Sequence, residues 1–145
     1  MRKFVYVLFF VVLPMVYTNN ISAQTNPSSE ELHKFFNNEQ LLITYREGEA
    51  LYGTYYFLEI HYCSSGYYGL YGSTVKRTVL GNEQKSNWQE YGTWKITSQN
   101  GVNGIFCAST TGNQMFYPIY KLANGSMYIS EGVSIVKKGR AICNN

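Results

Sequence analysis

Residues that could do acid–base chemistry come close together at one point of the sequence. Glu59 and His61 are two positions apart, so on a β-strand their side chains project from the same face. A carboxylate placed in this way can orient an imidazole as a general base. Nothing nearby has the pattern of an activated nucleophile. A pair on a sheet surface is therefore the favoured interpretation, and we expect neither a catalytic residue nor an enzyme.

The acidic residues exclude several enzyme classes. All nine are glutamates, so the chain cannot build a Ser-His-Asp triad, an Asp-rich calcium loop or an aspartic dyad. Glycoside hydrolysis needs two carboxylates across a cleft. The sequence does not decide whether such a pair forms among the glutamates near predicted turns and strand ends: Glu47, Glu49, Glu83 and Glu90.

A metal site is not expected either. His33 and His61 are the only histidines, the three cysteines are far apart, and no CxxC occurs. A zinc site takes three or four clustered ligands. We expect His33 on a helix surface and His61 on a sheet surface, with no metal and no cofactor.

Cys63, Cys107 and Cys143 allow one disulfide and leave one thiol. Three pairings are possible, and the spacing does not choose among them. Cys107 and Cys143 are the candidates, because their bridge would tie the end of the chain to a central strand. A closed loop of about 36 residues would stabilise the fold by about 3–4 kcal/mol.

The first 23 residues have the order of a secretory signal peptide. Arg2 and Lys3 precede an apolar run over 4–16, and Ala23 offers a cleavage site. The run is short for a membrane span, and a retained anchor helix is the alternative. Cleavage lowers the net charge from +3 to +1, since twelve basic residues become ten against nine acidic ones. We expect a secreted or periplasmic protein without nucleic-acid binding or membrane insertion.

A short helix is expected after a polar linker. Ser28 and Glu31 have the spacing of a capping box, and an apolar stripe of Leu32, Phe35 and Phe36 follows. These signals predict a helix over 29–37. The chain has the length of one domain, and we assign 1–23 to the signal peptide, 24–39 to the linker and helix, and 40–145 to the β-barrel domain.

From residue 40 onward, strand-like runs alternate with glycine-containing turns such as Asn100-Gly101. The predicted strands are 40–46, 51–62, 66–71, 73–80, 88–97, 103–109, 114–121, 126–130 and 133–138. Pro118 places its strand at an edge or a bulge. Tight turns favour an antiparallel up-and-down sheet, and closure into a small β-barrel removes its exposed edges. The helix could cap one mouth of this all-β barrel; a two-sheet sandwich is the alternative.

Alternation separates the two faces of the strands. The even-numbered side chains of 51–62 are the more uniformly apolar set, and Trp88, Gly92, Trp94 and Ile96 are in phase with one another. The strand 114–121 has aromatic residues on both faces. That pattern fits a ligand-facing interior, but a well-filled core is the favoured interpretation.

Residues 66–72 have the most unusual local composition, with tyrosines interleaved with glycines. Tyrosine combines a flat apolar face with a polar tip and is common at recognition surfaces. A kinked barrel strand is the plainer interpretation. If a ligand site exists, its candidate residues are Tyr67, Tyr68, Tyr71, Trp88, Trp94 and Tyr117.

The run WQEYGTWKI over 88–96, the turn that follows it and the tyrosine strand from Tyr117 to Lys121 resemble the second half of small lipocalin-like barrels of bacterial envelopes, such as the N-terminal domain of the NlpE copper-resistance lipoproteins. The similarity covers roughly residues 51–138 and implies a lipocalin-like barrel. The chain lacks that family's CxxC and lipid-attachment cysteine, so copper binding and lipid anchoring are not implied.

The sequence thus favours an exported, non-enzymatic binding module. Its partner would be an apolar molecule, a sugar or a protein. The alternatives are an inhibitor or interaction protein that acts through a protruding loop and, least favoured, a small hydrolase. An empty barrel interior would favour the binding module, and a filled one would favour the inhibitor.

Overall fold

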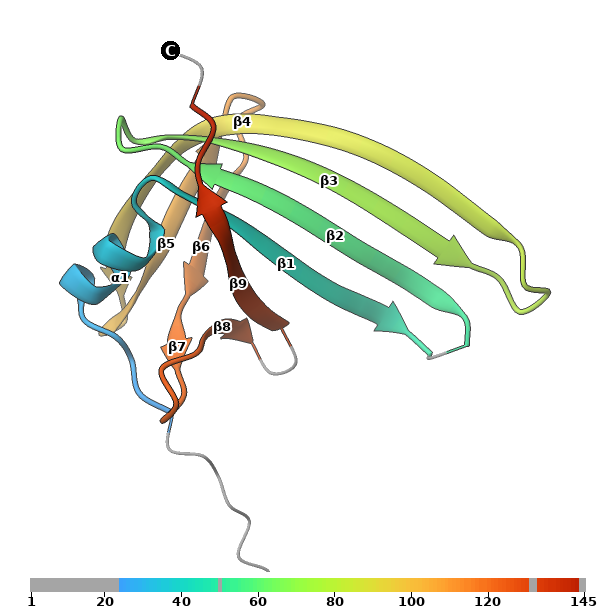
Figure 1. The fold of residues 1–145 in the computed structure, drawn as a ribbon, viewed down its shortest axis with the longest axis horizontal. Coiled ribbons are helices and arrows are strands. Elements are labelled where there is room, and N and C mark those ends of the chain that lie inside the picture. Colours follow the sequence, from blue (N-terminus) through green and yellow to red (C-terminus); the bar gives the residue numbers. More distant parts are fainter. Residues whose placement is uncertain (1–23, 50, 131–132, 144–145) are drawn as a thin grey trace, which may run out of the picture.

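The computed structural model describes residues 24–49, 51–130 and 133–143, so the predicted signal peptide lies outside the described residues. In this part of the chain one helix precedes a run of antiparallel strands (Figure 1). The elements are α1 (Ser29–Phe36), β1 (Glu39–Gly48), β2 (Gly53–Tyr62), β3 (Tyr67–Arg77), β4 (Glu83–Gln99), β5 (Val102–Ser109), β6 (Gln114–Pro118), β7 (Tyr120–Lys121), β8 (Met127–Ser130) and β9 (Val133–Arg140).

The strands form one sheet that curls into a nearly closed barrel, which confirms the predicted all-β barrel with a short helix rather than a two-sheet sandwich. Within the described residues the strand order is β6-β5-β4-β3-β2-β1-β9-β8-β7. Strands that follow one another in the chain pair with each other, except for β6 and β7. One further pair, β1 with β9, joins strands that are far apart in the chain, and there Ile43 lies opposite Ile135. In the part of the chain that the structure describes, β6 and β7 stand at the two ends of this order and no strand ladder joins them.

Helix α1 begins with the predicted capping box. The Glu31 amide donates to Ser28 Oγ at 3.1 Å, and the Ser28 amide donates to Glu31 Oε2 at 2.8 Å. Leu32 and Phe36 on its apolar stripe are buried in the barrel core, so the helix closes one end of the barrel as expected. No helix in the described part of the chain is long and apolar enough to cross a membrane.

The long strands extend beyond the closed part of the barrel as a curved arm, seen on the right in Figure 1. Here two predictions were wrong. The candidates 66–71 and 73–80 are one strand, β3, and β4 begins five residues before the predicted 88. Gly72 does not turn the chain. It makes room for Trp88 on the neighbouring strand, since a Cβ at Gly72 would lie 2.3 Å from the indole Cε2.

The barrel seam lies at Pro118, where the predicted strand 114–121 divides into β6 and β7. Proline has no amide hydrogen to continue a ladder, and the chain crosses from one sheet edge to the other through Ile119 alone. The side chain of Asn26 fills the seam. Its Nδ2 donates to the carbonyl oxygens of Asn103 at 3.1 Å and Ile119 at 3.0 Å, while its Oδ1 accepts from the Asn103 amide at 2.9 Å. The predicted polar linker is therefore part of the barrel wall.

The disulfide joins Cys63 to Cys143, so Cys107 is not the partner of Cys143. Cys107 is a buried free thiol on β5. The reason is orientation. Cys107 points into the barrel, whereas the chain end passes outside it, next to the end of β2 at Cys63. The bridge spans 80 residues of sequence.

We predict that Gly92→Ala destabilises the protein and Gly69→Ala does not. A Cβ at Gly92 would lie 2.1 Å from the Ala108 carbonyl oxygen, and backbone must move to accommodate it. A Cβ at Gly69 would make ordinary contacts of 3.5 Å with Tyr91. Urea denaturation followed by tryptophan fluorescence should give a loss of about 1–3 kcal/mol for Gly92→Ala and a change below about 1 kcal/mol for Gly69→Ala. Equal effects would contradict the close strand approach.

We also predict that Cys143→Ser lowers the free energy of unfolding by about 4 kcal/mol, because an 80-residue cross-link restricts the unfolded chain strongly. Cys107→Ala is the control and should cost only about 1 kcal/mol. Dithiothreitol should destabilise the wild type and Cys107→Ala but leave Cys143→Ser unchanged. Sensitivity of Cys143→Ser to the reductant would show a different pairing.

Candidate functional site

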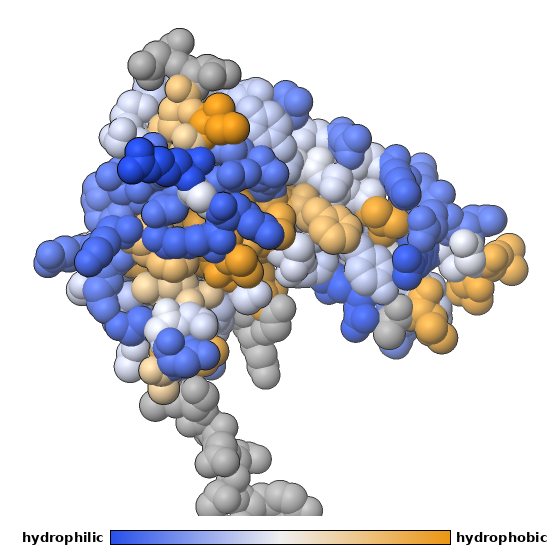
Figure 2. All heavy atoms as spheres, viewed as in Figure 1, coloured by the Kyte–Doolittle hydropathy of each residue, from blue (hydrophilic) through white to orange (hydrophobic). Residues whose placement is uncertain are grey.

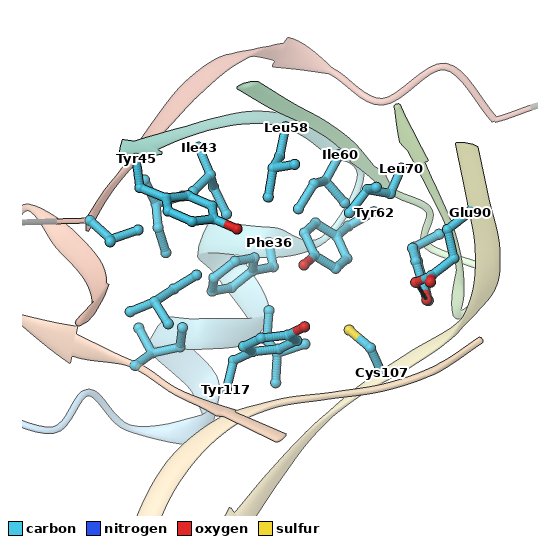
Figure 3. A pocket seen from close by; sticks show the side chains of 16 residues that line it. Phe36, Ile43, Tyr45, Leu58, Ile60, Tyr62, Leu70, Glu90, Cys107 and Tyr117 are labelled. Carbon is cyan, nitrogen blue, oxygen red and sulfur yellow. Dashed lines mark hydrogen bonds between the residues drawn. The ribbon is translucent and has the colours of Figure 1, made fainter. Parts of the chain in front are cut away.

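The inward-facing side chains do not fill the barrel, and a cavity of about 290 Å³ remains between them. Figure 3 shows this space enclosed by side chains from strands on opposite sides of the barrel. The lining is mainly apolar, with tyrosines, one thiol and one carboxylate among it: Phe36, Ile43, Tyr45, Leu58, Ile60, Tyr62, Tyr68, Leu70, Glu90, Ile105, Cys107, Tyr117, Ile119, Ile129, Val133 and Ile135.

Strand register brings these side chains to the same space. On β2 the even-numbered Leu58, Ile60 and Tyr62 line the cavity, which confirms the face predicted to be more apolar. Because the ladders are antiparallel, inward positions lie opposite inward positions: Ile43 faces Leu58 on β1 and β2, and Leu70 faces Glu90 on β3 and β4. The alternation of the strands therefore determines the composition of the cavity wall.

Helix α1 forms the floor of the cavity. Phe36 is 2% exposed and packs edge-on against Tyr62, with their ring centroids 5.3 Å apart. Tyr62 in turn packs edge-on against Trp94, at 5.2 Å. The Trp94 indole nitrogen donates to the Cys63 carbonyl oxygen at 2.9 Å, so the polar atom of this buried side chain has a partner. Below the cavity the core is packed.

Glu90 projects into the cavity from β4. The Tyr68 hydroxyl donates to its Oε1 at 2.6 Å, a short charge-assisted hydrogen bond. Figure 3 shows the Glu90 carboxylate on the side of the cavity opposite Tyr45, with the Cys107 thiol and the Tyr117 hydroxyl turned toward the central space. The cavity thus combines an apolar wall with a few polar groups that converge on its interior, as ligand sites do.

Burial holds these groups in their protonated forms. Desolvation raises the pKa of Tyr62 well above its usual value, and the Cys107 side chain beside it raises it further. Desolvation followed by the hydrogen bond to Glu90 raises the pKa of Tyr68. The pKa of Cys107 is raised to about 12, chiefly by burial, so the thiol is not a nucleophile at neutral pH.

Two of the six candidate residues line the cavity, Tyr68 and Tyr117. Trp94 lies in the core between the helix and the cavity. Tyr67 and Tyr71 are on the outer face, 62% and 40% exposed. Trp88 is 40% exposed where the arm leaves the barrel. Because strand β3 is continuous, its alternation divides the tyrosine-glycine segment between the two faces.

The Glu59–His61 pair forms on the outer face, with His61 Nε2 2.8 Å from Glu59 Oε1. His61 is 3% exposed, so the expectation of a surface histidine was wrong: the C-terminal segment covers it, and its Nδ1 accepts from the Ile142 amide at 2.9 Å. Both ring nitrogens are occupied. His33 is exposed on the helix, as expected. In the described ranges no three potential metal-ligating side chains come together.

Sequence reasoning missed the polar end of the cavity. Glu90 is in phase with Gly92 and Trp94, so the same alternation that sorted the aromatic residues would have placed a carboxylate inside the barrel. The sequence placed Phe36 on the apolar stripe of the helix and Tyr62 on the more apolar face of its strand, but it did not bring the two together at a ligand cavity. Their role depends on the helix meeting the end of β2, which local pattern does not specify.

Comparison with family models, with curated proteins and with solved structures finds no match for this chain. The fold and the cavity define a class, a small antiparallel β-barrel with an unfilled, largely apolar interior. The resemblance to lipocalin-like envelope barrels stays a prediction.

We predict that the protein loses stability as pH rises above about 10. The pKa values of Tyr62, Tyr68 and Tyr117 are raised in the folded protein, each mainly by desolvation. Above the ordinary tyrosine pKa of about 10, the unfolded chain has released protons that the folded protein still holds. The free energy of unfolding therefore falls as pH rises.

Urea denaturation from pH 8 to pH 11, with tyrosinate absorbance as a second signal, measures this decline. The Tyr62→Phe variant lacks one of the three hydroxyl groups. Its free energy of unfolding should therefore fall less steeply than that of the wild type, by up to about 1.4 kcal/mol per pH unit. Parallel declines in the wild type and Tyr62→Phe would show that Tyr62 ionises normally in the folded protein.

Proposed function

We propose that this protein is an exported, non-enzymatic binding protein that holds one small, largely apolar molecule inside its barrel. The cavity carries the proposal. Barrels of about eight strands are narrow enough for side chains to fill or to accommodate one small ligand. Here about 290 Å³ is left open, near the lower end of the roughly 300–1,000 Å³ found for ligand pockets.

The distribution of apolar side chains supports a site rather than loose packing. The layer that contains Leu32, Leu41 and Trp94 is closely packed, each residue being at most 7% exposed. The cavity lies beyond Phe36, where tyrosines and Glu90 line it together with aliphatic side chains. Larger apolar side chains at Val133 or Ile43 would remove the void and stabilise the fold. An unfilled interior at these positions is expected if a ligand completes the core.

Export is supported by the order of the first 23 residues and by the disulfide between Cys63 and Cys143, since disulfides persist in oxidising compartments. A role without catalysis is supported by the occupied ring nitrogens of His61 and by the protonated state of Cys107. A secreted or periplasmic carrier or sensor of a small molecule fits these features.

The arm supports a second candidate, an interaction protein. Its two hairpin ends carry Leu51, Val79 and Leu80, which are 85%, 79% and 87% exposed. They lie at the same end of the sheet, because Gly53 pairs with Arg77, and Figure 2 shows apolar atoms gathered there. Exposed apolar side chains on protruding turns can insert into a partner. In this alternative the cavity is not needed for activity.

We predict that Leu58→Trp prevents or weakens ligand binding by about tenfold or more, because a larger side chain occupies the cavity. 1-Octanol serves as a neutral apolar probe, and isothermal titration calorimetry measures its affinity. Phe57→Trp is the matched control. It introduces the same side chain at the neighbouring position on β2, on the outer face where Phe57 is 43% exposed, and should leave the affinity unchanged.

If the wild type bound neither octanol nor octylamine, or if both tryptophan variants lost octanol affinity equally, a ligand site inside the barrel would be contradicted. Thermal unfolding of each variant shows whether the fold is intact. Native mass spectrometry of the purified protein, looking for a retained small molecule, tests the same function without a chosen probe.

A further inference from the structure

The cavity has a negative end and no positive group. Of the residues that line it, Glu90 is the only acidic one, and no lysine, arginine or histidine is among them. Each of the four ion pairs found in the described residues uses a different glutamate: Glu31, Glu39, Glu59 and Glu83. Glu90 is half-buried without a cationic partner from this part of the chain.

The position of Glu90 is fixed rather than free. Its Oε1 accepts the 2.6 Å hydrogen bond from Tyr68, which holds the carboxylate against the cavity wall and leaves Oε2 for another donor. Tyr68 is 5% exposed and is itself held between β2 and β4 by the ladders of β3. A half-buried carboxylate with one neutral partner is costly to keep desolvated, and a bound cation would offset that cost.

The influence of the carboxylate reaches other groups in the cavity. Besides burial, the negative charge of Glu90 raises the pKa values of Cys107 and Tyr117, which project from β5 and β6. The whole polar end of the cavity therefore favours positive charge and disfavours negative charge. The tyrosine rings around it add faces that attract an ammonium group. Tyr62 and Tyr68 lie side by side there, with centroids 6.4 Å apart.

We propose that the ligand is a small amine whose protonated nitrogen pairs with Glu90 and whose apolar part lies among Ile43, Leu58 and Ile135. The proposal rests on the proposed function, because it needs the cavity to be a ligand site. It specifies the ligand further: a positive head group, a body of modest size to fit about 290 Å³, and no carboxylate or phosphate. The ion pair forms on the polar side of the cavity, and the apolar body fills the void next to Phe36.

Three probes of equal chain length separate charge from apolar binding: n-octylamine, 1-octanol and octanoate. At pH 7 the amine is protonated and octanoate is ionised. Calorimetric titration of the wild type should give an affinity for octylamine at least about tenfold above that for octanol, and weaker binding still for octanoate. The order follows from the sign of the charge on Glu90.

Glu90→Gln tests the carboxylate itself. Glutamine retains an oxygen that can accept from the Tyr68 hydroxyl, so the wall is preserved while the charge is removed. Octylamine should bind about tenfold more weakly to Glu90→Gln, octanoate should bind more tightly, and octanol should change less than about twofold. Glu83→Gln is the matched control on the same strand. It removes one negative charge on the arm, where Glu83 pairs with Arg77, and should not alter the order of the probes.

The outcomes separate the two proposals. Octanol binding without a preference for the amine, or an amine affinity unchanged in Glu90→Gln, overturns the amine proposal and leaves the cavity as a binding site. Preference for octanoate overturns it as well. Absence of binding by all three probes to the wild type counts against both the amine and the proposed function.

Discussion

The structure depends on the pairing of β1 with β9. The strands β1 to β6 form a meander, and the strands β7 to β9 form a separate short run. Only the ladder that places Ile43 opposite Ile135 joins the two at one side. Without it the sheet would divide in two, the edges of β1 and β9 would also be open, and the apolar inner face would lie exposed. With it the inner face surrounds a common space, so closure creates both the core and the cavity.

Closure of the sheet does not by itself leave a cavity. Whether the interior is filled depends on the side chains of the inner face. At the helix end, Leu32, Leu41 and Trp94 fill the barrel. Further along, tyrosines and Glu90 take inward positions whose polar atoms prevent tight apolar packing. The Ala108 backbone approaches Gly92 closely, and the Trp88 indole lies against Gly72. The same alternation that buries the core thus places the Glu90 carboxylate in a largely apolar cavity. This carboxylate makes the polar end of the cavity negative.

Local signals predicted the elements well, and long-range contacts account for the differences. The capping box at Ser28 and the glycine turns depend on neighbouring residues, so pattern was enough to find them. The break at Pro118 was recognisable as an irregularity, because proline cannot extend a ladder. The partner of Cys143 was not accessible from sequence, since it depends on the route of the chain end over the outer face. Gly72 illustrates the same limit: it makes room for Trp88 on the neighbouring strand, and this contact is not visible in the local pattern, so the glycine was taken as a break between two strands.

The seam at Asn26 bears on how a growing chain can fold. Asn26 is made early, yet its partners Asn103 and Ile119 follow 77 and 93 residues later. The strand β9 that closes the other junction comes later still. The first described residues must therefore remain unpaired until Ile119 has been synthesised, and the wall can be completed only after β9 has followed. Contacts of such long sequence separation make for slow folding. During that interval the inner face and the free thiols of Cys63 and Cys107 are open to other molecules.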